Sequence, residues 1–302
     1  MLTKINSIGN IIQCYQNGNY HIIILNDGTK IRYTEEEKWR PLFPESIDVK
    51  ITNKCDLKCP YCHESSTIDG EHCDMNKTIE VLNDLPAGVE LAIGGGNPLE
   101  HPELFPFLEW CKSRHLICNI TINSDHFKKM NHISKILSNK LIYGLGISYS
   151  NETFRVAPHY KNTVCHVILG IHSLNEIENA LSLYGKILIL GYKDFGRGQI
   201  YKHSLSSKID NIKNNLWKLF QMDGIISFDN LAIKQLQLEN YFYEYAWKEF
   251  YMGNDGDFTM YYDAVEQKFG KNSCTKNTER ESSDYGIIKF FNSLKLFEEE
   301  KK

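Results

Sequence analysis

Three cysteines stand close together in the segment Cys55-Asp56-Leu57-Lys58-Cys59-Pro60-Tyr61-Cys62. The spacing, Cys-x3-Cys-x2-Cys, places three thiols on one compact loop. Cysteine thiolates are the usual protein ligands of iron–sulfur clusters, which normally take four of them. A cluster held by only three keeps an open position on one iron, as a catalytic metal site requires. We therefore expect Cys55, Cys59 and Cys62 to be metal ligands of a catalytic site.

A second segment able to support chemistry reads Ile93-Gly94-Gly95-Gly96-Asn97-Pro98-Leu99-Glu100-His101-Pro102-Glu103-Leu104. Glycine has no side chain, so the backbone there can approach a ligand closely and bind its polar groups. Glycine-rich turns also connect strands to helices in many proteins without a ligand. Taken alone, this segment leaves both readings open.

Together the two segments resemble the signatures of the radical S-adenosylmethionine (SAM) superfamily. That superfamily has the same cysteine spacing with an aromatic residue before the third cysteine, the place of Tyr61, and a Gly-Gly-Glu-Pro segment. The resemblance implies a [4Fe–4S] cluster on the three cysteines, whose open iron binds the amino and carboxylate groups of SAM. It further implies reduction by an external one-electron donor such as flavodoxin or ferredoxin. SAM is then cleaved to a 5′-deoxyadenosyl radical that abstracts hydrogen from a substrate.

The resemblance also assigns the SAM contacts, which lie in the two segments and at the ends of later strands: Tyr61, Gly95, Gly96, Asn97, Pro98, Asn123, Ser148, Ile168 and Gly191. For the strand-end positions, a simple packing or turn role is the open alternative. Asn97 stands where the superfamily has Glu. Its amide oxygen can accept a hydrogen bond from an ammonium but brings no charge. We therefore expect recognition of the amino group to be weakened or shared.

The elements that would position these residues follow an α/β pattern from residue 45 to residue 198. Short apolar strands alternate with helical stretches, which predicts a parallel sheet with right-handed crossovers. The resemblance implies that these units form a partial (β/α)6 TIM-like barrel, with the cysteine loop after its first strand. The expected strands are Ser46–Thr52, Val89–Ile93, Ile117–Asn123, Tyr143–Tyr149, Thr163–Gly170 and Lys186–Gly191, and the expected helices are Lys77–Leu85, Pro102–Arg114, Phe127–Leu137 and Leu174–Tyr184.

Two further regions flank the predicted barrel. Residues 1–44 contain Asn-Gly and Asp-Gly turns between β-rich stretches and predict a small antiparallel meander. Residues 199–302 predict an α+β extension on the substrate side. Its expected elements are a helix over Ile209–Gln221, a strand over Ile225–Phe228, an aromatic-rich helix over Tyr241–Tyr251, a strand pair within Phe258–Phe269 and a final amphipathic helix over 284–298. We expect Tyr241, Tyr245 and Trp247 to pack in the core.

Three single residues beyond the cysteine loop have more than one possible role. Arg197 could bind a carboxylate or phosphate of a substrate, although a solvated loop charge is the expected role. Asp229 could face the barrel mouth, but a helix cap is favoured because Asp is a common N-cap residue. Cys274 could donate hydrogen to a product radical, whereas a lone cysteine is more often inert.

The composition limits the classes of protein to which the chain can belong. The chain has 302 residues, of which 42% are hydrophobic and 24% charged, as in an ordinary globular protein. Its net charge of −4 argues against a nucleic-acid partner, which would favour a basic surplus. No long apolar run is present, so we expect no signal peptide, no membrane span and a cytoplasmic location.

Two other functions remain open from the sequence. The chain could be an iron–sulfur redox sensor without radical chemistry, or an interaction module stabilised by zinc on Cys59, Cys62, His72 and Cys73. The spacing to His72 is short for a zinc ribbon. The cysteines after Cys62 are scattered, which argues against the second cluster that many peptide-modifying relatives carry. The substrate is therefore expected to be a small metabolite or a peptide, with a slight preference for the former.

Overall fold

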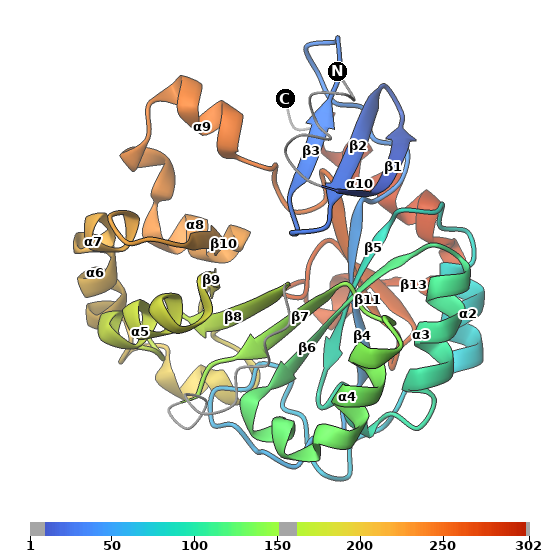
Figure 1. Cartoon of the computed structure of the whole chain (residues 1–302), viewed down its shortest axis with the longest axis horizontal. Coiled ribbons are helices and arrows are strands. Elements are labelled where there is room, and N and C mark those ends of the chain that lie inside the picture. The colour runs from blue at the N-terminus through green and yellow to red at the C-terminus, as the bar shows by residue number, and fades with distance from the viewer. Residues whose placement is uncertain (1–9, 151–161, 300–302) are drawn as a thin grey trace.

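The computed structural model describes residues 10–150 and 162–299 (Figure 1). Within them, a ten-stranded sheet forms the body of the molecule and a separate three-stranded sheet packs against one end of it. The first nine residues of the predicted meander lie outside the described residues.

The small sheet is the predicted N-terminal meander. It consists of β1 (Ile11–Asn17), β2 (Tyr20–Leu25) and β3 (Lys30–Tyr33), joined antiparallel in chain order. Glu45 fixes this sheet to the body: its buried carboxylate accepts hydrogen bonds from the Tyr20 hydroxyl at 2.7 Å and from Arg32 Nη2 at 3.1 Å. A buried carboxylate is stable only when it is paired in this way.

The large sheet confirms the predicted run of parallel strands. Six strands lie side by side in chain order: β4 (Ser46–Thr52), β5 (Glu90–Gly95), β6 (Ile117–Asn123), β7 (Gly144–Ser148), β8 (Thr163–Ile168) and β9 (Lys186–Leu190). Two strands from after residue 198 extend the run in parallel, β10 (Ile225–Phe228) beside β9 and β11 (Thr259–Asp263) beside β4. β10 and β11 do not pair with each other, so the run stays open between them. The hairpin strands β12 (Lys268–Gly270) and β13 (Glu281–Ser282) continue antiparallel beyond β11.

The two faces of this sheet differ in composition. Alternate residues such as Ile47, Val49 and Ile51 of β4 are fully buried in the core on the outer face, together with Phe107 and Leu82 of the covering helices. These helices are α2 (Met75–Leu82), α3 (Leu104–Ser113), α4 (Met130–Ser138) and α5 (Leu174–Tyr184). α5 begins with a capping box formed by Ser173 and Glu176.

The inner face carries small residues on β5 and β7: Ala92, Gly94, Gly144 and Gly146. The interior of a closed eight-stranded barrel is filled by branched side chains. Ala92 and Gly94 line a hollow on this face, which we call the lumen. The space beside Gly144 and Gly146 is instead occupied by the side chains of Asn119 and His166.

The C-terminal region contains α6 (Ser206–Asn214), α7 (Leu216–Phe220), α8 (Asn230–Leu236), α9 (Glu244–Phe250) and α10 (Ile287–Glu299). The prediction of core packing is wrong for two residues of the aromatic stripe, because Tyr241 and Tyr245 are 47% and 74% exposed. α9 has no buried residue and lies away from the large sheet (Figure 1), so its aromatic rings stack on one another, as in the Trp247–Tyr251 pair. Among the described helices, none has the length and apolar character of a membrane span.

Candidate active site

The cysteine loop leaves the carboxyl end of β4 and folds back over it. Backbone hydrogen bonds fix it at several points: Asn53 donates to the Glu71 carbonyl at 2.8 Å, Cys55 to Thr67 at 2.7 Å and Cys73 to Ile51 at 2.9 Å. Cys55, Cys59 and Cys62 are all half-buried. The loop therefore holds three accessible thiols in a defined place above the sheet.

The charges around these thiols suit a cationic group. Burial, followed by the neighbouring Cys62 and Cys55, raises the pKa of Cys59 to about 11, and burial also raises the pKa of Cys55. Without a cation the Cys55 and Cys59 thiols stay protonated, because burial disfavours their charged form. Bound iron would supply the positive charge that deprotonates them.

The three sulfurs do not all lie within 4.8 Å of one another, as the ligands of one ion would. Ligands of one zinc ion, at bonds of about 2.3 Å, lie about 4 Å apart. Across the part of the chain that the structure describes, one set of three ligand atoms falls within 4.8 Å, namely those of Cys55, Asp56 and His126. The three cysteines do not form such a set. Wider spacing fits a cluster in which each cysteine binds a different iron.

The zinc site considered from the sequence is not assembled. The His72 Nδ1 lies 2.8 Å from the Thr52 hydroxyl, and the buried Cys73 sulfur lies 3.5 Å from His101 Nε2. Both side chains therefore have partners outside the cysteine loop, and they do not join Cys59 and Cys62 in a set of ligand atoms within 4.8 Å among the described residues.

Arg197 is part of the cysteine loop's support, which corrects the expectation of a solvated charge. Its Nε donates to the Cys59 carbonyl at 2.9 Å, its Nη1 to the Ser66 carbonyl at 2.9 Å, and its backbone N–H to the Cys62 carbonyl at 3.0 Å. The planar guanidinium can reach two carbonyls at once, which a lysine cannot do. No local pattern in the sequence reveals this role, because the partners lie more than 130 positions away.

The glycine segment packs directly on the cysteine loop. Gly96 N–H donates to the Thr52 carbonyl and Asn97 N–H to the Lys54 carbonyl, both at 2.7 Å. A Cβ on Gly95, whose φ is +114°, would lie 2.4 Å from the Thr52 oxygen, and one on Gly96 would lie 2.3 Å from the Lys54 oxygen. These two glycines are therefore required by contact between the two segments.

Gly94 differs from its two neighbours and was missed by the sequence analysis. A Cβ built there meets no atom within 4 Å, and Gly94 lines the lumen. The signal that could have found it is the alternation of β5, in which Leu91 and Ile93 point to the outer core and Gly94 to the inner face.

Asn97 and Pro98 are buried outside the lumen lining. The Asn97 Oδ1 accepts a hydrogen bond from Leu99 N at 3.2 Å and so caps the short helical turn Pro98–Glu100. Its Nδ2 is buried without a partner among the described residues. The amide oxygen that was expected to meet an ammonium is thus used inside the protein.

The lumen below the cysteine loop has a volume of about 490 Å³, within the range of small-ligand sites. The structure brings together there the three cysteines and seven of the nine predicted SAM contacts: Tyr61, Gly95, Gly96, Asn123, Ser148, Ile168 and Gly191. These residues come from the ends of β4 through β9, so residues distant in sequence converge because parallel strands end at one edge of the sheet.

A second and larger hollow adjoins the lumen. This outer chamber has a volume of about 1110 Å³. The two share wall residues, including Lys50, His63, Glu64 and Lys193. Cys274 lines the outer chamber, and burial raises the pKa of its thiol.

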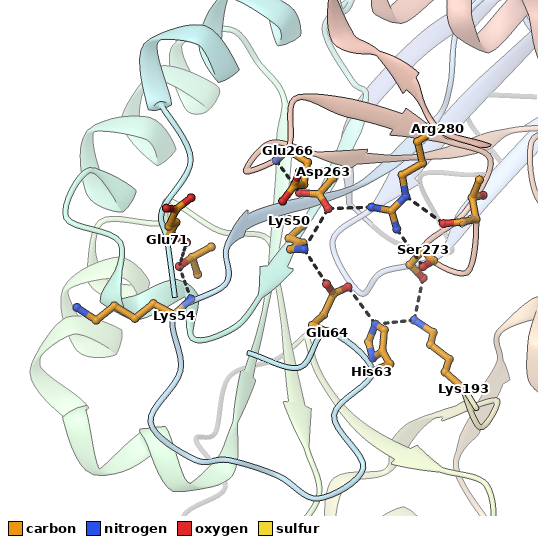
Figure 2. A network of polar contacts seen from close by, with 12 residues as sticks. Lys50, Lys54, His63, Glu64, Glu71, Lys193, Asp263, Glu266, Ser273 and Arg280 are labelled. Atoms are coloured by element: carbon orange, nitrogen blue, oxygen red, sulfur yellow. Dashed lines mark hydrogen bonds and ion pairs between the residues drawn. The ribbon is translucent and has the colours of Figure 1, made fainter. Parts of the chain in front are cut away.

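A chain of polar contacts runs along the shared wall (Figure 2). Lys50 Nζ lies 2.8 Å from Glu64 and 3.0 Å from Asp263. At the other end, Lys193 Nζ contacts His63 Nε2 at 3.0 Å and the Ser273 hydroxyl at 2.8 Å. Side chains next to the cysteine loop are thereby fixed to β11 and to the segment after β12.

Asp229 confirms the favoured role of helix cap. Its Oδ1 accepts hydrogen bonds from Ala232 N at 2.7 Å, in the first turn of α8, and from Gly191 N at 2.8 Å, at the end of β9. Burial nevertheless raises its pKa. The same residue lines the lumen, so the cap also closes part of the cavity wall.

Comparison with solved structures shows which known proteins share this fold. No family model matches the chain, and neither does any curated protein. SuiB of Streptococcus suis bound to S-adenosylmethionine matches with a TM-score of 0.63 at 12% identity, covering 92% of this chain and 86% of SuiB. This chain has the SuiB fold. SuiB bound to its precursor peptide SuiA matches with a TM-score of 0.56 at 14% identity, over 83% of this chain and 65% of that one. The predicted fold class, an α/β partial barrel with a small N-terminal meander and an α+β C-terminal extension, is confirmed.

The contact between the glycine segment and the cysteine loop predicts opposite outcomes for two adjacent substitutions. Gly96→Ala places a Cβ against the Lys54 carbonyl, so we expect it to lower the free energy of unfolding by about 1–3 kcal/mol, as overpacking does. Gly94→Ala, the matched control, enters open space and should change stability by less than about 1 kcal/mol. Chemical denaturation measures both, and equal losses would contradict the assigned contact.

The Arg197 clamp predicts a loss that lysine cannot rescue. Arg197→Ala leaves the Cys59 and Ser66 carbonyls without their charged donor, and we expect a loss of about 1.5–3 kcal/mol and faster proteolysis within residues 53–73. Arg197→Lys should recover less than half of that loss, because an ammonium has no planar fork. Full rescue by lysine would show that only the charge matters.

Proposed function

We propose that this chain is a radical SAM enzyme that holds a [4Fe–4S] cluster on Cys55, Cys59 and Cys62 and binds SAM in the lumen. The observation that carries the proposal is the convergence of three thiols and seven of the nine predicted SAM contacts on one lumen of about 490 Å³. When bound, the cluster would supply one electron to SAM and so produce the radical that removes hydrogen from the substrate. SuiB, which shares the fold, has been solved with S-adenosylmethionine.

Different residues of the lumen would bind different parts of SAM. The backbone of Gly94–Gly96 meets the amino group, since no side chain covers it at Gly94. Asn123 and Ser148 offer hydrogen bonds, and Ile168 offers an apolar surface to the adenine. Asn97 keeps the turn in shape through its bond to Leu99, so backbone carbonyls take the recognition role that the superfamily's Glu would share.

Electrons must reach the cluster from outside the protein. Asp56, Lys58 and Pro60 of the cysteine loop are exposed, so the loop presents one side to solvent and its thiols to the lumen. We infer that an external one-electron donor such as flavodoxin or ferredoxin docks on that exposed side. A cytoplasmic location fits this chemistry, because the free thiols need a reducing compartment.

The substrate is proposed to be a peptide or another extended molecule. The outer chamber of about 1110 Å³ exceeds the range typical of small-metabolite sites, and it adjoins the lumen. SuiB is known in a structure with its precursor peptide. The scattered C-terminal cysteines argue against a second cluster, but they do not limit the size of the substrate.

Anaerobic reconstitution tests the proposed function. The protein should bind about four irons and four sulfides and, with dithionite, convert SAM to 5′-deoxyadenosine. Cys55→Ala, Cys59→Ala and Cys62→Ala should each lose the cluster and this activity. Cys14→Ala, at an exposed cysteine of the meander, is the matched control and should retain both.

Two other results would contradict the proposed function. Stoichiometric zinc without iron would identify a zinc-stabilised module. A stable cluster that yields no 5′-deoxyadenosine with SAM and reductant would identify a redox sensor.

A further inference from the structure

Asp48 places an unpaired carboxylate inside the lumen. Its neighbours Ile47 and Val49 point to the outer core, so Asp48 faces inward, where it lines the lumen and is accessible from it. The strand partner on β5 is Ala92, whose small side chain leaves space beside the carboxylate. Asp48 makes no hydrogen bond or ion pair with any residue that the structure describes.

Tyr261 lies beside Asp48 on the other side. The two residues are register partners in the parallel pairing of β11 with β4, and Tyr261 also lines the lumen. It is only 3% exposed, and its hydroxyl has no hydrogen-bond partner among the described residues. A buried hydroxyl without a partner costs stability, so a missing ligand group is the physical explanation that the geometry favours.

The nearby cations do not neutralise Asp48. Lys50, on the same strand, is held by Glu64 and Asp263. Lys193 forms hydrogen bonds with two neutral partners, His63 and Ser273. It forms no hydrogen bond or ion pair with Asp48 and affects that carboxylate only through its charge.

Two further carboxylates act on Asp48, those of Asp229 and Asp255. Asp255 accepts hydrogen bonds from Asn230 at 2.8 Å and Asn272 at 2.6 Å, and Asp229 accepts its bonds from backbone N–H groups. Neither has a basic side chain within 4 Å among the described residues. Three carboxylates therefore share one ammonium, so this part of the lumen attracts a cation.

We propose that Asp48 and Tyr261 form a subsite for a basic group of the substrate, a protonated amine or a guanidinium. The inference rests on the proposed function and names the chemical class of its substrate. The basic group enters from the outer chamber. It donates one hydrogen bond to the Asp48 carboxylate and a second to the Tyr261 hydroxyl oxygen. Asp48 lies two residues below Lys50, the register partner of Gly94, or about 7 Å deeper along the strand. The subsite is thus separate from the level at which SAM is proposed to bind.

Matched peptides test this subsite. Binding of acetyl-Gly-Lys-Gly-amide and of its norleucine analogue is measured by calorimetry at pH 8, on the reconstituted full chain with SAM and no reductant. We expect at least tenfold tighter binding of the lysine peptide. Asp48→Asn should abolish this preference, and Tyr261→Phe should reduce it several-fold. The matched control Asp210→Asn, at an exposed carboxylate of the outer chamber, should keep it.

The same experiment distinguishes the source of the amine. If n-butylamine binds as tightly as the lysine peptide, the basic group alone is recognised; tighter binding of the peptide identifies a peptide substrate. Burial raises the pKa of Asp48 to about 6, so the preference should be full at pH 8 and decline as the pH falls through about 6 and the carboxylate is protonated.

Folding of the variants is checked by thermal unfolding. Asp48→Asn removes a carboxylate without a partner and should leave the unfolding temperature unchanged or higher. Equal affinity for the two peptides in the unsubstituted protein, or a lysine preference that survives Asp48→Asn, would overturn the subsite. Iron content and 5′-deoxyadenosine are measured separately, so intact SAM cleavage without lysine preference refutes the subsite alone.

Discussion

The contact between two backbone segments, the end of β4 and the turn after β5, determines the rest of the site. The Thr52 and Lys54 carbonyls accept the N–H groups of Gly96 and Asn97, and only glycine fits at positions 95 and 96. This contact sets the height of the cysteine loop above the sheet, and Arg197 ties down the loop's far side. Because the loop is held from both sides, the three half-buried thiols have a fixed position at the mouth of the lumen.

The hollow interior depends on which residues stand on the inner face of the sheet. Ala92 and Gly94 on β5 border space that side chains would fill in a closed barrel, and the run of parallel strands remains open between β10 and β11. Side chains on either side of this opening, including Lys193 and Tyr261, border the lumen. The architecture therefore combines a lumen at the strand ends with an opening on one side.

Local patterns in the sequence predicted much of this arrangement. β4, β6 and α5 have the expected bounds, and the cysteines and most strand-end contacts share one cavity, because strand periodicity and parallel topology are encoded within short stretches. Pairing of β11 with β4 and the anchoring of Arg197 join residues far apart in the chain, which no local pattern can show. The helix α9 forms where it is expected, but the core packing predicted for Tyr241 and Tyr245 is wrong, since an aromatic stripe does not reveal whether a partner surface exists. The sequence analysis did not predict a role for Asp48, because an acidic residue in an apolar strand indicates a binding site only once its neighbour Tyr261 is known.

The proposed chemistry requires SAM to reach an open iron of a cluster held by Cys55, Cys59 and Cys62. Electron paramagnetic resonance of the reduced, reconstituted protein tests this most directly, with electron–nuclear double resonance on SAM labelled with ¹⁵N in its amino group. We predict that SAM changes the spectrum of the reduced cluster and that the label produces a ¹⁵N hyperfine coupling. A spectrum that is the same with and without SAM, with no coupling from the label, would contradict the account.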